Sequence, residues 1–385
     1  MPTQTEAMII SPTSTQLPIT SFEGCVSLGN PIQNTFPRQC TDMNGQVFKE
    51  ELPPGVIFGK AYLEDGRTET VYSIISTIDG GYIITGQANR YQCLIRKVDS
   101  YGETQWEYAL GLELRDEFQF TNGLFTCWSA RQILDGGYVI IGTGHQEMSI
   151  KSNSFLLMLD RDGNRKSVEE FRWKDGMSLQ LGQEGKPFWL SLFGLAGKLM
   201  ETSDNGYAVV GRIWIDAPND NMHLFRADAN GNYLWERNLC RDEKITEAWE
   251  KEIVCSDNNL WSGIQSQDGG FVFTGGFNET WLVKTNSDGF VEWVKTFNEA
   301  SGHAVIQTPD GGFLIAGGSG DGLLIKTDNA GNLQWSKTYG GEQYDRFTKM
   351  IINPRGEVIV AGSTESFGKG SESIWLLGFD LSSLE

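Results

Sequence analysis

The sequence has little cysteine and no long apolar run, and each shortage excludes a class of protein. Six cysteines are spread over 385 residues, and none stands in a Cys-x-x-Cys pair, which argues against zinc-ribbon and thioredoxin-type sites. We expect these thiols to be free and buried, with three disulfides as the alternative for an exported chain. No run of about 20 apolar residues is present, so we expect no membrane insertion.

Basic residues are also scarce. The 31 Lys and Arg residues face 50 Asp and Glu residues, which gives a formal net charge of −19. Proteins that bind nucleic acid carry basic faces, so we expect no nucleic-acid partner. Residues 1–15 show no basic start followed by an apolar stretch, so no secretory signal peptide is predicted. Localisation therefore stays open between the cytoplasm and export by a non-classical route.

The sequence does contain a short repeated motif in six copies, which we call the first phrase. It consists of an Asp-Gly-Gly-aromatic turn, a β-branched run and a closing glycine. The copies begin at Asp79, Asp135, Asp204, Asp268 and Asp310, with a looser one at Arg355. A second phrase follows, in which a strand leads through an Asp-x-x-Gly turn into a strand carrying Trp. With another short apolar strand ahead of each turn, every unit is predicted to be four antiparallel strands. Repeated units of this kind are the blades of a β-propeller.

The N-terminal segment decides how many blades are counted. Residues 22–29 match the first phrase with a degraded turn, and residues 39–45 match the second. We therefore predict an all-β fold, a seven-bladed β-propeller, with six or eight blades as alternatives. We expect residues 19–385 to form one propeller domain, preceded by a tail at 1–18. The last blade lacks its outermost strand, and we predict that residues 7–10 of this tail supply it and close the ring.

The two phrases resemble those of a widespread group of bacterial and archaeal β-propellers, whose blades read Asp-Gly-Gly-Tyr-(Ile/Val)-x-x-Gly and then Asp-x-x-Gly-Asn-x-x-Trp. The resemblance covers residues 22–380 and implies the fold but no single activity. Ser167 departs from the pattern, because it stands where the family has Trp. Quinone-cofactor propellers use a related repeat, but the adjacent cysteines seen in many of them have no counterpart here, and we expect no cofactor.

Chain direction assigns the loops to two faces of the propeller. Both repeated turns are expected on one face, which is short and regular and therefore interpreted as structural. The other face receives long, dissimilar connections at residues 144–152, 174–195, 214–221 and 238–262. Variable loops on a rigid scaffold usually carry binding, so we place the functional site on this variable face.

Aromatic residues support that choice. Counting back seven residues from each turn reaches the innermost strands, which line the central channel. This count and the long loops give seven candidate ligand-binding residues: Tyr72, Trp128, Trp189, Trp214, Trp249, Trp261 and His303. Such a ring of aromatic side chains is suited to stacking a sugar or another flat ligand. The alternative is that the rings plug the channel and pack against inserted loops.

No catalytic or metal motif is complete in the sequence. The three histidines fall in different blades, so we expect no metal site. If the protein is a glycoside hydrolase or lyase, its acid/base pair would come from five carboxylates near the channel mouth: Glu69, Asp116, Glu247, Glu250 and Asp345. We favour a non-enzymatic propeller that binds a glycan or a protein partner. The alternatives are that enzyme and a structural component of a larger assembly, and the oligomeric state is left open.

Overall fold

The chain forms two compact units in the computed structural model. The structure describes residues 19–33, 35–62, 67–89, 92–111, 123–146, 152–171, 198–212, 222–229, 233–242, 246–247, 260–367 and 372–383. The units are Met1–Glu51 and Leu52–Glu385. The division between the propeller and the N-terminal segment therefore lies after Glu51, and not after residue 18 as predicted.

The first unit is a small disulfide-linked fold. It contains α1 (Phe22–Ser27) and a three-stranded sheet of β1 (Ile32–Gln33), β2 (Gln39–Thr41) and β3 (Val47–Lys49). Its buried residues are Phe22, Cys25, Cys40 and Phe48, and a disulfide joins the two cysteines. The prediction that residues 22–29 form part of a blade is wrong, because Ser21 caps a helix there by accepting from Gly24 N.

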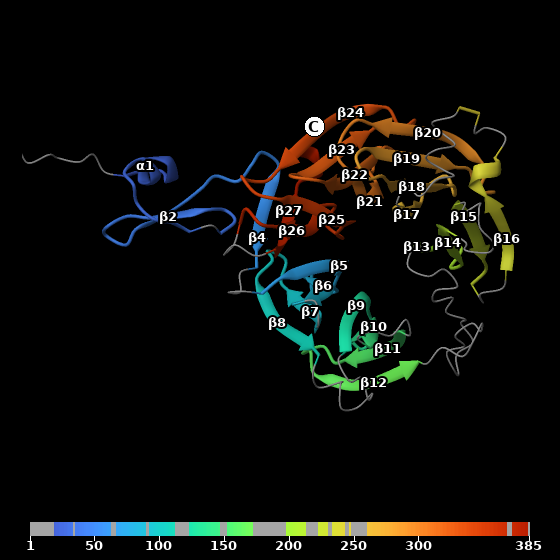
Figure 1. Ribbon diagram of the computed structural model, residues 1–385, viewed down its shortest axis with the longest axis horizontal. Coiled ribbons are helices and arrows are strands. Elements are labelled where there is room, and N and C mark those ends of the chain that lie inside the picture. Colours follow the sequence, from blue (N-terminus) through green and yellow to red (C-terminus); the bar gives the residue numbers. More distant parts are fainter. Residues whose placement is uncertain are drawn as a thin grey trace, which may run out of the picture. The chain divides into compact units, whose positions relative to one another are not determined.

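The second unit consists of six four-stranded antiparallel sheets, which we number as blades 1 to 6 (Figure 1). Blade 1 is β5 (Glu69–Ser76), β6 (Tyr82–Ala88), β7 (Gln92–Val98) and β8 (Thr104–Leu110), and blade 2 is β9 (Gly123–Gln132), β10 (Tyr138–Gln146), β11 (Ser152–Leu159) and β12 (Arg165–Phe171). Blade 3 is β13 (Lys198–Glu201), β14 (Tyr207–Arg212), β15 (Met222–Ala227) and β16 (Tyr233–Asn238), and blade 4 is β17 (Leu260–Gln265), β18 (Phe271–Gly275), β19 (Thr280–Thr285) and β20 (Val291–Phe297). Blade 5 is β21 (Gly302–Gln307), β22 (Phe313–Gly318), β23 (Gly322–Thr327) and β24 (Leu333–Tyr339), and blade 6 is β25 (Asp345–Ile352), β26 (Val358–Thr364), β27 (Ser373–Phe379) and β4 (Val56–Ala61).

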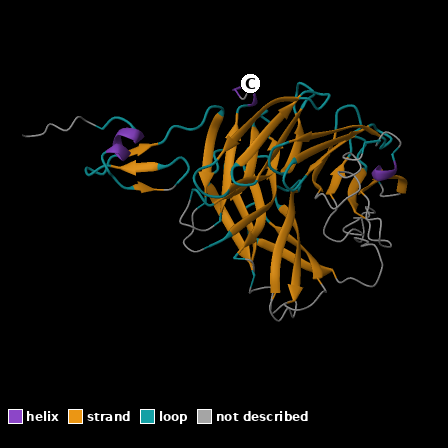
Figure 2. Ribbon diagram, turned by 45° about the horizontal axis from the view of Figure 1, so that its top comes forward, coloured by secondary structure: helices purple, strands orange, loops and turns teal. Residues whose placement is uncertain are grey.

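The all-β class and the four antiparallel strands of each blade are confirmed. Of the seven sheets that the described residues form, six are these blades, and the seventh is the three-stranded sheet of the first unit. The described residues thus form six blades, one of the two alternatives to the predicted seven. Two 3-10 helices, η1 (Leu239–Arg241) and η2 (Leu381–Ser383), are the only helices described in the second unit, as Figure 2 shows. Among the described residues, no helix has the length and apolarity that crossing a membrane requires.

An N-terminal strand closes the propeller, as predicted, but it is a different strand. β4 pairs with β27, with Ala61 opposite Trp375, and so becomes the outermost strand of blade 6. β25 of the same blade contacts β5 of blade 1. The closing residues are therefore 56–61 and not 7–10, which lie outside the described residues. Residues 56–61 suit this position because Val56, Phe58 and Ala61 are buried on pairing.

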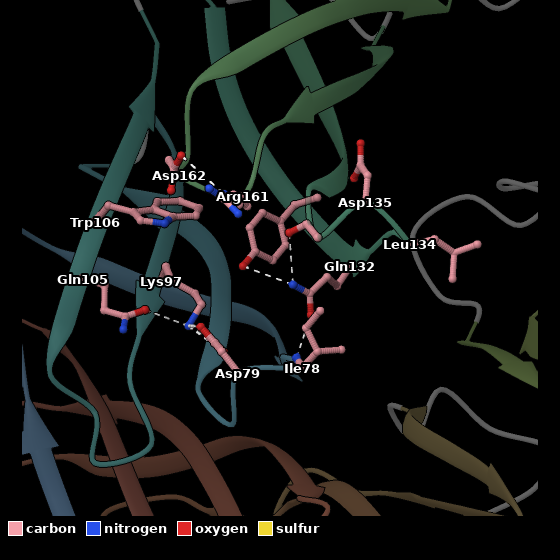
Figure 3. A pocket seen from close by; sticks show the side chains of 12 residues that line it. Ile78, Asp79, Lys97, Gln105, Trp106, Gln132, Leu134, Asp135, Arg161 and Asp162 are labelled. Carbon is pink, nitrogen blue, oxygen red and sulfur yellow. Dashed lines mark hydrogen bonds and ion pairs between the residues drawn. The ribbon is translucent and has the colours of Figure 1, made fainter.

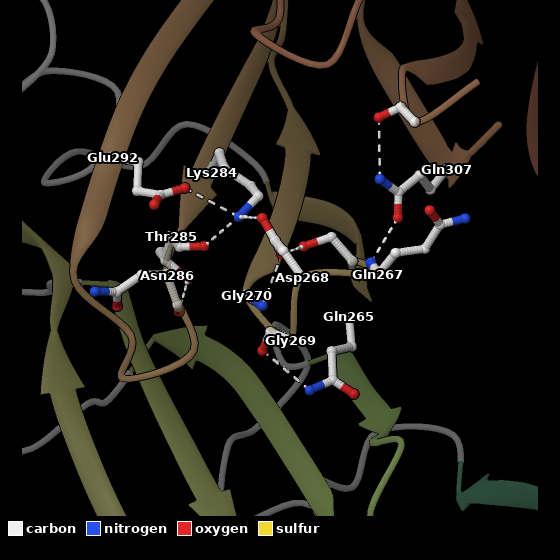
Figure 4. A network of polar contacts seen from close by, with 12 residues as sticks. Gln265, Gln267, Asp268, Gly269, Gly270, Lys284, Thr285, Asn286, Glu292 and Gln307 are labelled. Carbon is white, nitrogen blue, oxygen red and sulfur yellow. Dashed lines mark hydrogen bonds and ion pairs between the residues drawn. The ribbon is translucent and has the colours of Figure 1, made fainter. Parts of the chain in front are cut away.

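In blades 1, 3, 4 and 5 the aspartate of the first turn is paired with a buried cation from the third strand of the same blade. In blade 4 the Asp268 carboxylate accepts from Gly270 N at 2.9 Å and lies 2.8 Å from Lys284 Nζ (Figure 4). Lys284 also donates to Thr285 O at 2.7 Å and to Glu292 at 3.0 Å. Because every donor of this buried ammonium has an acceptor, the lysine belongs to the turn and not to a ligand site.

Neighbouring blades are joined by repeated contacts. Gln307 Oε1 accepts from Gln267 N of the preceding blade at 2.7 Å, while its Nε2 donates to Gly311 O at 3.0 Å. Gln132 and Gln265 make the same pair of contacts. The Trp of a fourth strand packs against the next blade: a Cβ added at Gly331 would lie 2.8 Å from the Trp293 ring. Residues in and beside the two repeated sequence phrases therefore form the contacts between adjacent blades.

The five cysteines that the structure describes are all disulfide-bonded, so the expectation of free thiols is wrong. Cys93 in β7 bonds Cys127 in β9, which ties blade 1 to blade 2 inside their shared core. Cys240 is also in a disulfide. Spacing alone did not reveal the Cys25–Cys40 and Cys93–Cys127 pairs, because each joins two elements that only the folded chain brings together.

Candidate functional site

Five innermost strands carry a β-bulge at the same position. The strands β5, β9, β13, β17, β21 and β25 lie nearest the centre of the ring in Figure 1. In all of these except β13 the pairing register skips one residue. The skipped residues are Tyr72, Trp128, Trp261, His303 and Thr348. A bulge leaves its extra residue out of the ladder and re-aims the side chain, so the fold itself sets these positions apart.

Tyr72 and Trp128 form one aromatic pair across blades 1 and 2. Their ring centroids lie 4.6 Å apart with an interplanar angle of 47°. Trp128 Nε1 donates to Thr143 Oγ1 at 2.8 Å, yet the residue stays 37% exposed. Burial raises the pKa of Tyr72, and the Glu372 carboxylate adds to the effect, so the phenol is neutral at physiological pH. The pair therefore presents a fixed and uncharged surface to solvent.

Trp261 and His303 form the corresponding pair across blades 4 and 5. Their ring centroids lie 5.4 Å apart, and the rings are almost perpendicular at 86°. Trp261 Nε1 donates to Gly276 O at 3.2 Å and leaves the residue 44% exposed. His303 Nδ1 donates to Phe347 O at 2.8 Å, and burial lowers the pKa of the imidazole below its usual 6.5. This second pair is therefore also neutral at pH 7.

These exposed indoles differ from the tryptophans of the blade interiors. Trp281 in β19 and Trp375 in β27 are fully buried. By contrast, Trp128 and Trp261 keep an open face while their N–H groups are already bonded to protein. An indole held in this way offers a flat apolar surface and needs no rearrangement to receive a ligand.

The remaining aromatic candidates lie outside the described residues. Trp189, Trp214 and Trp249 belong to this group, as do the carboxylates Asp116 and Glu250. Glu247 is described and is exposed.

The other two carboxylates are buried and engaged in the fold. Glu69 forms a bidentate pair with Arg96, with both N···O distances at 2.9 Å. Asp345 accepts from Gly341 N at 2.8 Å and from Ser366 Oγ at 2.7 Å. These contacts connect strand ends and loops of the propeller. Within the part of the chain that the structure describes, no three His, Cys, Asp or Glu side chains are grouped to hold a metal ion.

The repeated-turn face holds a cavity that the sequence reasoning missed. It measures about 510 Å³ and lies between the turns of blades 1 and 2 (Figure 3). Asp135 of the first turn type and Asp162 of the second both line it, so the two turns share one face, as predicted. The available signal was the residue before each turn Asp. It is Ile78 and Leu134 in these blades, but Ser203, Gln267, Pro309 and Pro354 elsewhere.

Comparisons with known proteins found only distant similarities. No family model matches the chain, and no curated protein is similar to it in sequence. A solved structure of a protein of unknown function from Bacteroides caccae is 14% identical, with a TM-score of 0.39 over 78% of this chain and 89% of that one. A glucose dehydrogenase is 10% identical, with a TM-score of 0.45 over 84% of this chain and 99% of its own. The WD40 β-propeller domain of Doa1 is 10% identical, with a TM-score of 0.44 over 86% of this chain and 99% of its own. Similarities this distant carry no argument about ligand or activity.

Proposed function

We propose that this propeller is a non-enzymatic binding protein that holds a glycan against the exposed indoles of its innermost strands. One observation carries the proposal: the bulges extrude Trp128 and Trp261 at equivalent positions, where both remain exposed. Sugar rings present flat faces of C–H groups, and indole is the side chain with the largest flat apolar surface for stacking on them. We also propose that the chain belongs with the repeat propellers whose blade phrases it resembles.

The surroundings of the two indoles support a binding role. Each Nε1 is held by one hydrogen bond, to Thr143 or to the Gly276 carbonyl, which fixes the ring orientation. Tyr72 and His303 pack beside them and carry no charge at pH 7. A neutral ligand therefore meets a preorganised neutral surface, which lowers the entropic cost of binding.

A glycan array on the intact chain, followed by calorimetric titration of the best glycan, tests this proposal. Trp128→Ala and Trp261→Ala should each weaken binding at least about 10-fold, the size expected when one stacked aromatic ring is lost. Tyr233→Ala is the matched control, because Tyr233 is an exposed aromatic residue of the outermost strand β16. It should leave the affinity unchanged.

The same variants identify a failure. We call Tyr72, Trp128, Trp261 and His303 the axial aromatic residues, and their surroundings the axial site. If glycan binding survives both Trp substitutions, the axial indoles of Trp128 and Trp261 are not the binding site. If no glycan binds but a purified protein partner does, with the same dependence on both indoles, the site stands and the glycan assignment falls.

A further inference from the structure

The cavity between blades 1 and 2 has aromatic walls. Trp106 of β8 and Tyr138 of β10 meet edge to face, with centroids 5.7 Å apart and planes at 63°. Gln132 Nε2 donates to Tyr138 OH at 3.4 Å and to Gly136 O at 3.1 Å, so this wall is held in place by the repeated blade contact. The cavity thus has an ordered aromatic lining, in which Tyr138 is itself 2% exposed.

Three carboxylates and two cations line the cavity, and Lys166, which is not part of the lining, lies 2.8 Å from the Asp135 carboxylate. The carboxylates of Asp79 and Asp135 are half-exposed, and that of Asp162 is exposed. Lys97 also lines the cavity, but its buried ammonium is committed to Asp79, Val98 O and Gln105. Arg161 is the one exposed cation of the lining, with Nε 3.7 Å from the Asp162 carboxylate.

The phenol of Tyr138 lies close to two of these carboxylates and has a raised pKa. Burial, followed by the carboxylates of Asp79 and Asp162, raises its pKa to about 12. Burial disfavours a charge of either sign, whereas the two carboxylates disfavour the phenolate and favour a cation.

The rim of the cavity is apolar in a way that the other blades do not repeat. Ile78 is 83% exposed, and Leu134 is fully exposed. The equivalent residues of the remaining blades are Ser203, Gln267, Pro309 and Pro354. Two exposed aliphatic side chains beside one cavity are costly on a free surface and suit contact with a partner.

We propose that this cavity docks a segment of a protein partner in which an arginine is flanked by apolar residues. The guanidinium would enter between the aromatic walls and the carboxylates, and the apolar neighbours would contact Ile78 and Leu134. Charge complementarity and the apolar rim together select this occupant. The proposal is independent of the axial site, because none of the four axial aromatic residues lines the cavity.

The test uses the intact chain and two peptides that differ in one charge. The probes are acetyl-Leu-Arg-Leu-amide and the same peptide with citrulline, which has the shape of arginine without its charge. We expect the arginine peptide to bind at least 10-fold more tightly by calorimetric or NMR titration. Equal affinities of the two peptides, or no binding of either, would overturn the proposal.

Three variants locate the site. Asp162→Asn should weaken the arginine peptide at least 3-fold, because it removes an exposed carboxylate without disturbing the buried wall. Arg161→Gln should strengthen binding, because it removes the competing cation of the lining. Trp128→Ala should have no effect, which separates this site from the axial one. Agmatine, a free guanidinium compound, should bind more weakly than the peptide, and equal affinity would overturn the role of the apolar rim.

Discussion

The junction between blades 1 and 2 and the junction between blades 4 and 5 are built from the same parts but are secured differently. Gln132 accepts from Ile78 N in the first, and Gln307 accepts from Gln267 N in the second. Each also carries one axial aromatic pair. The Cys93–Cys127 disulfide, however, belongs to the first junction. The repeat thus conserves the contacts that orient the blades and varies what fills the space between them.

The cation that pairs with the turn aspartate also differs between blades. In blade 5 the buried Lys326 lies 2.7 Å from Asp310. In blade 2 Met158 takes the place of this lysine, and Asp135 pairs instead with the partly exposed Lys166 at 2.8 Å. The described cavity opens beside that same Asp135. The turn of the blade without the buried lysine therefore pairs its aspartate with a lysine that is closer to solvent.

The largest effect is expected from the disulfide of the first junction. Cys93→Ala with Cys127→Ala should lower the free energy of unfolding by about 3–4 kcal/mol, because the bridge closes a loop of 34 residues. Urea denaturation of the propeller transition measures it. Removing the Cys25–Cys40 bridge of the other unit is the control and should leave that transition in place. If the urea midpoint of the Cys93/Cys127 variant is unchanged, the disulfide does not stabilise the first junction, and the proposed difference between the junctions is wrong.

The next largest effect compares the loss of the aspartate that pairs with buried Lys326 with the loss of the one that pairs with Lys166. Asp310→Ala removes the carboxylate that pairs with the buried Lys326 and should lower the free energy of unfolding by about 2–3 kcal/mol. This is somewhat less than for a fully buried pair, because Asp310 is half-exposed. Asp135→Ala leaves only the accessible Lys166 unpaired and should cost clearly less. Thermal and chemical denaturation of both variants supply the comparison. Equal losses would show that burial of the cation does not decide the cost.

Substitution of the glycine that packs against the Trp ring should destabilise different junctions by similar amounts. Gly163 and Gly331 have φ values of +85° and +77°, and an added Cβ would lie 2.7 Å from Trp106 or 2.8 Å from Trp293. Gly163→Ala and Gly331→Ala should each cost about 2 kcal/mol through backbone strain and the displaced ring. Gly311→Ala has a similar φ, but its added Cβ would meet only Asn329 Cβ at 3.9 Å, and it should cost about 1 kcal/mol. Unequal values for Gly163 and Gly331 would mean that the Trp contact is not equivalent at the two junctions.

The smallest effect distinguishes the axial pairs by pH. The lowered pKa of His303 means that the unfolded chain binds more protons than the folded chain just below pH 6.5. Its contribution to stability is therefore present above pH 6.5 and declines as the pH falls toward 5. His303→Gln should flatten this part of the stability profile, whereas Tyr72→Phe should not, because the pKa of Tyr72 is raised above 10. Identical profiles for His303→Gln and the unaltered chain would contradict the assignment.

Local chemistry explains what was predictable from the sequence. The turns follow from Asp and Gly, and counting from them located Tyr72 and Trp261 because the distance from turn to bulge is constant along each inner strand. Features that depend on departures from the repeat were missed. Residues 22–29 match a blade phrase, but the cap at Ser21 makes them helical. The cavity was missed because its lining comes from the turns of two neighbouring blades, which only the folded chain brings together.

Closure by β4 has a consequence for how the protein is made. β4 precedes every other strand of the propeller in the chain, and its partner β27 follows all of them. A nascent chain on the ribosome can build blades 1 to 5 in turn, but the sheet that seals the circle must wait until β27 has emerged. Until then both β4 and blade 6 present bare hydrogen-bonding edges, which is the period of greatest risk for self-association during synthesis.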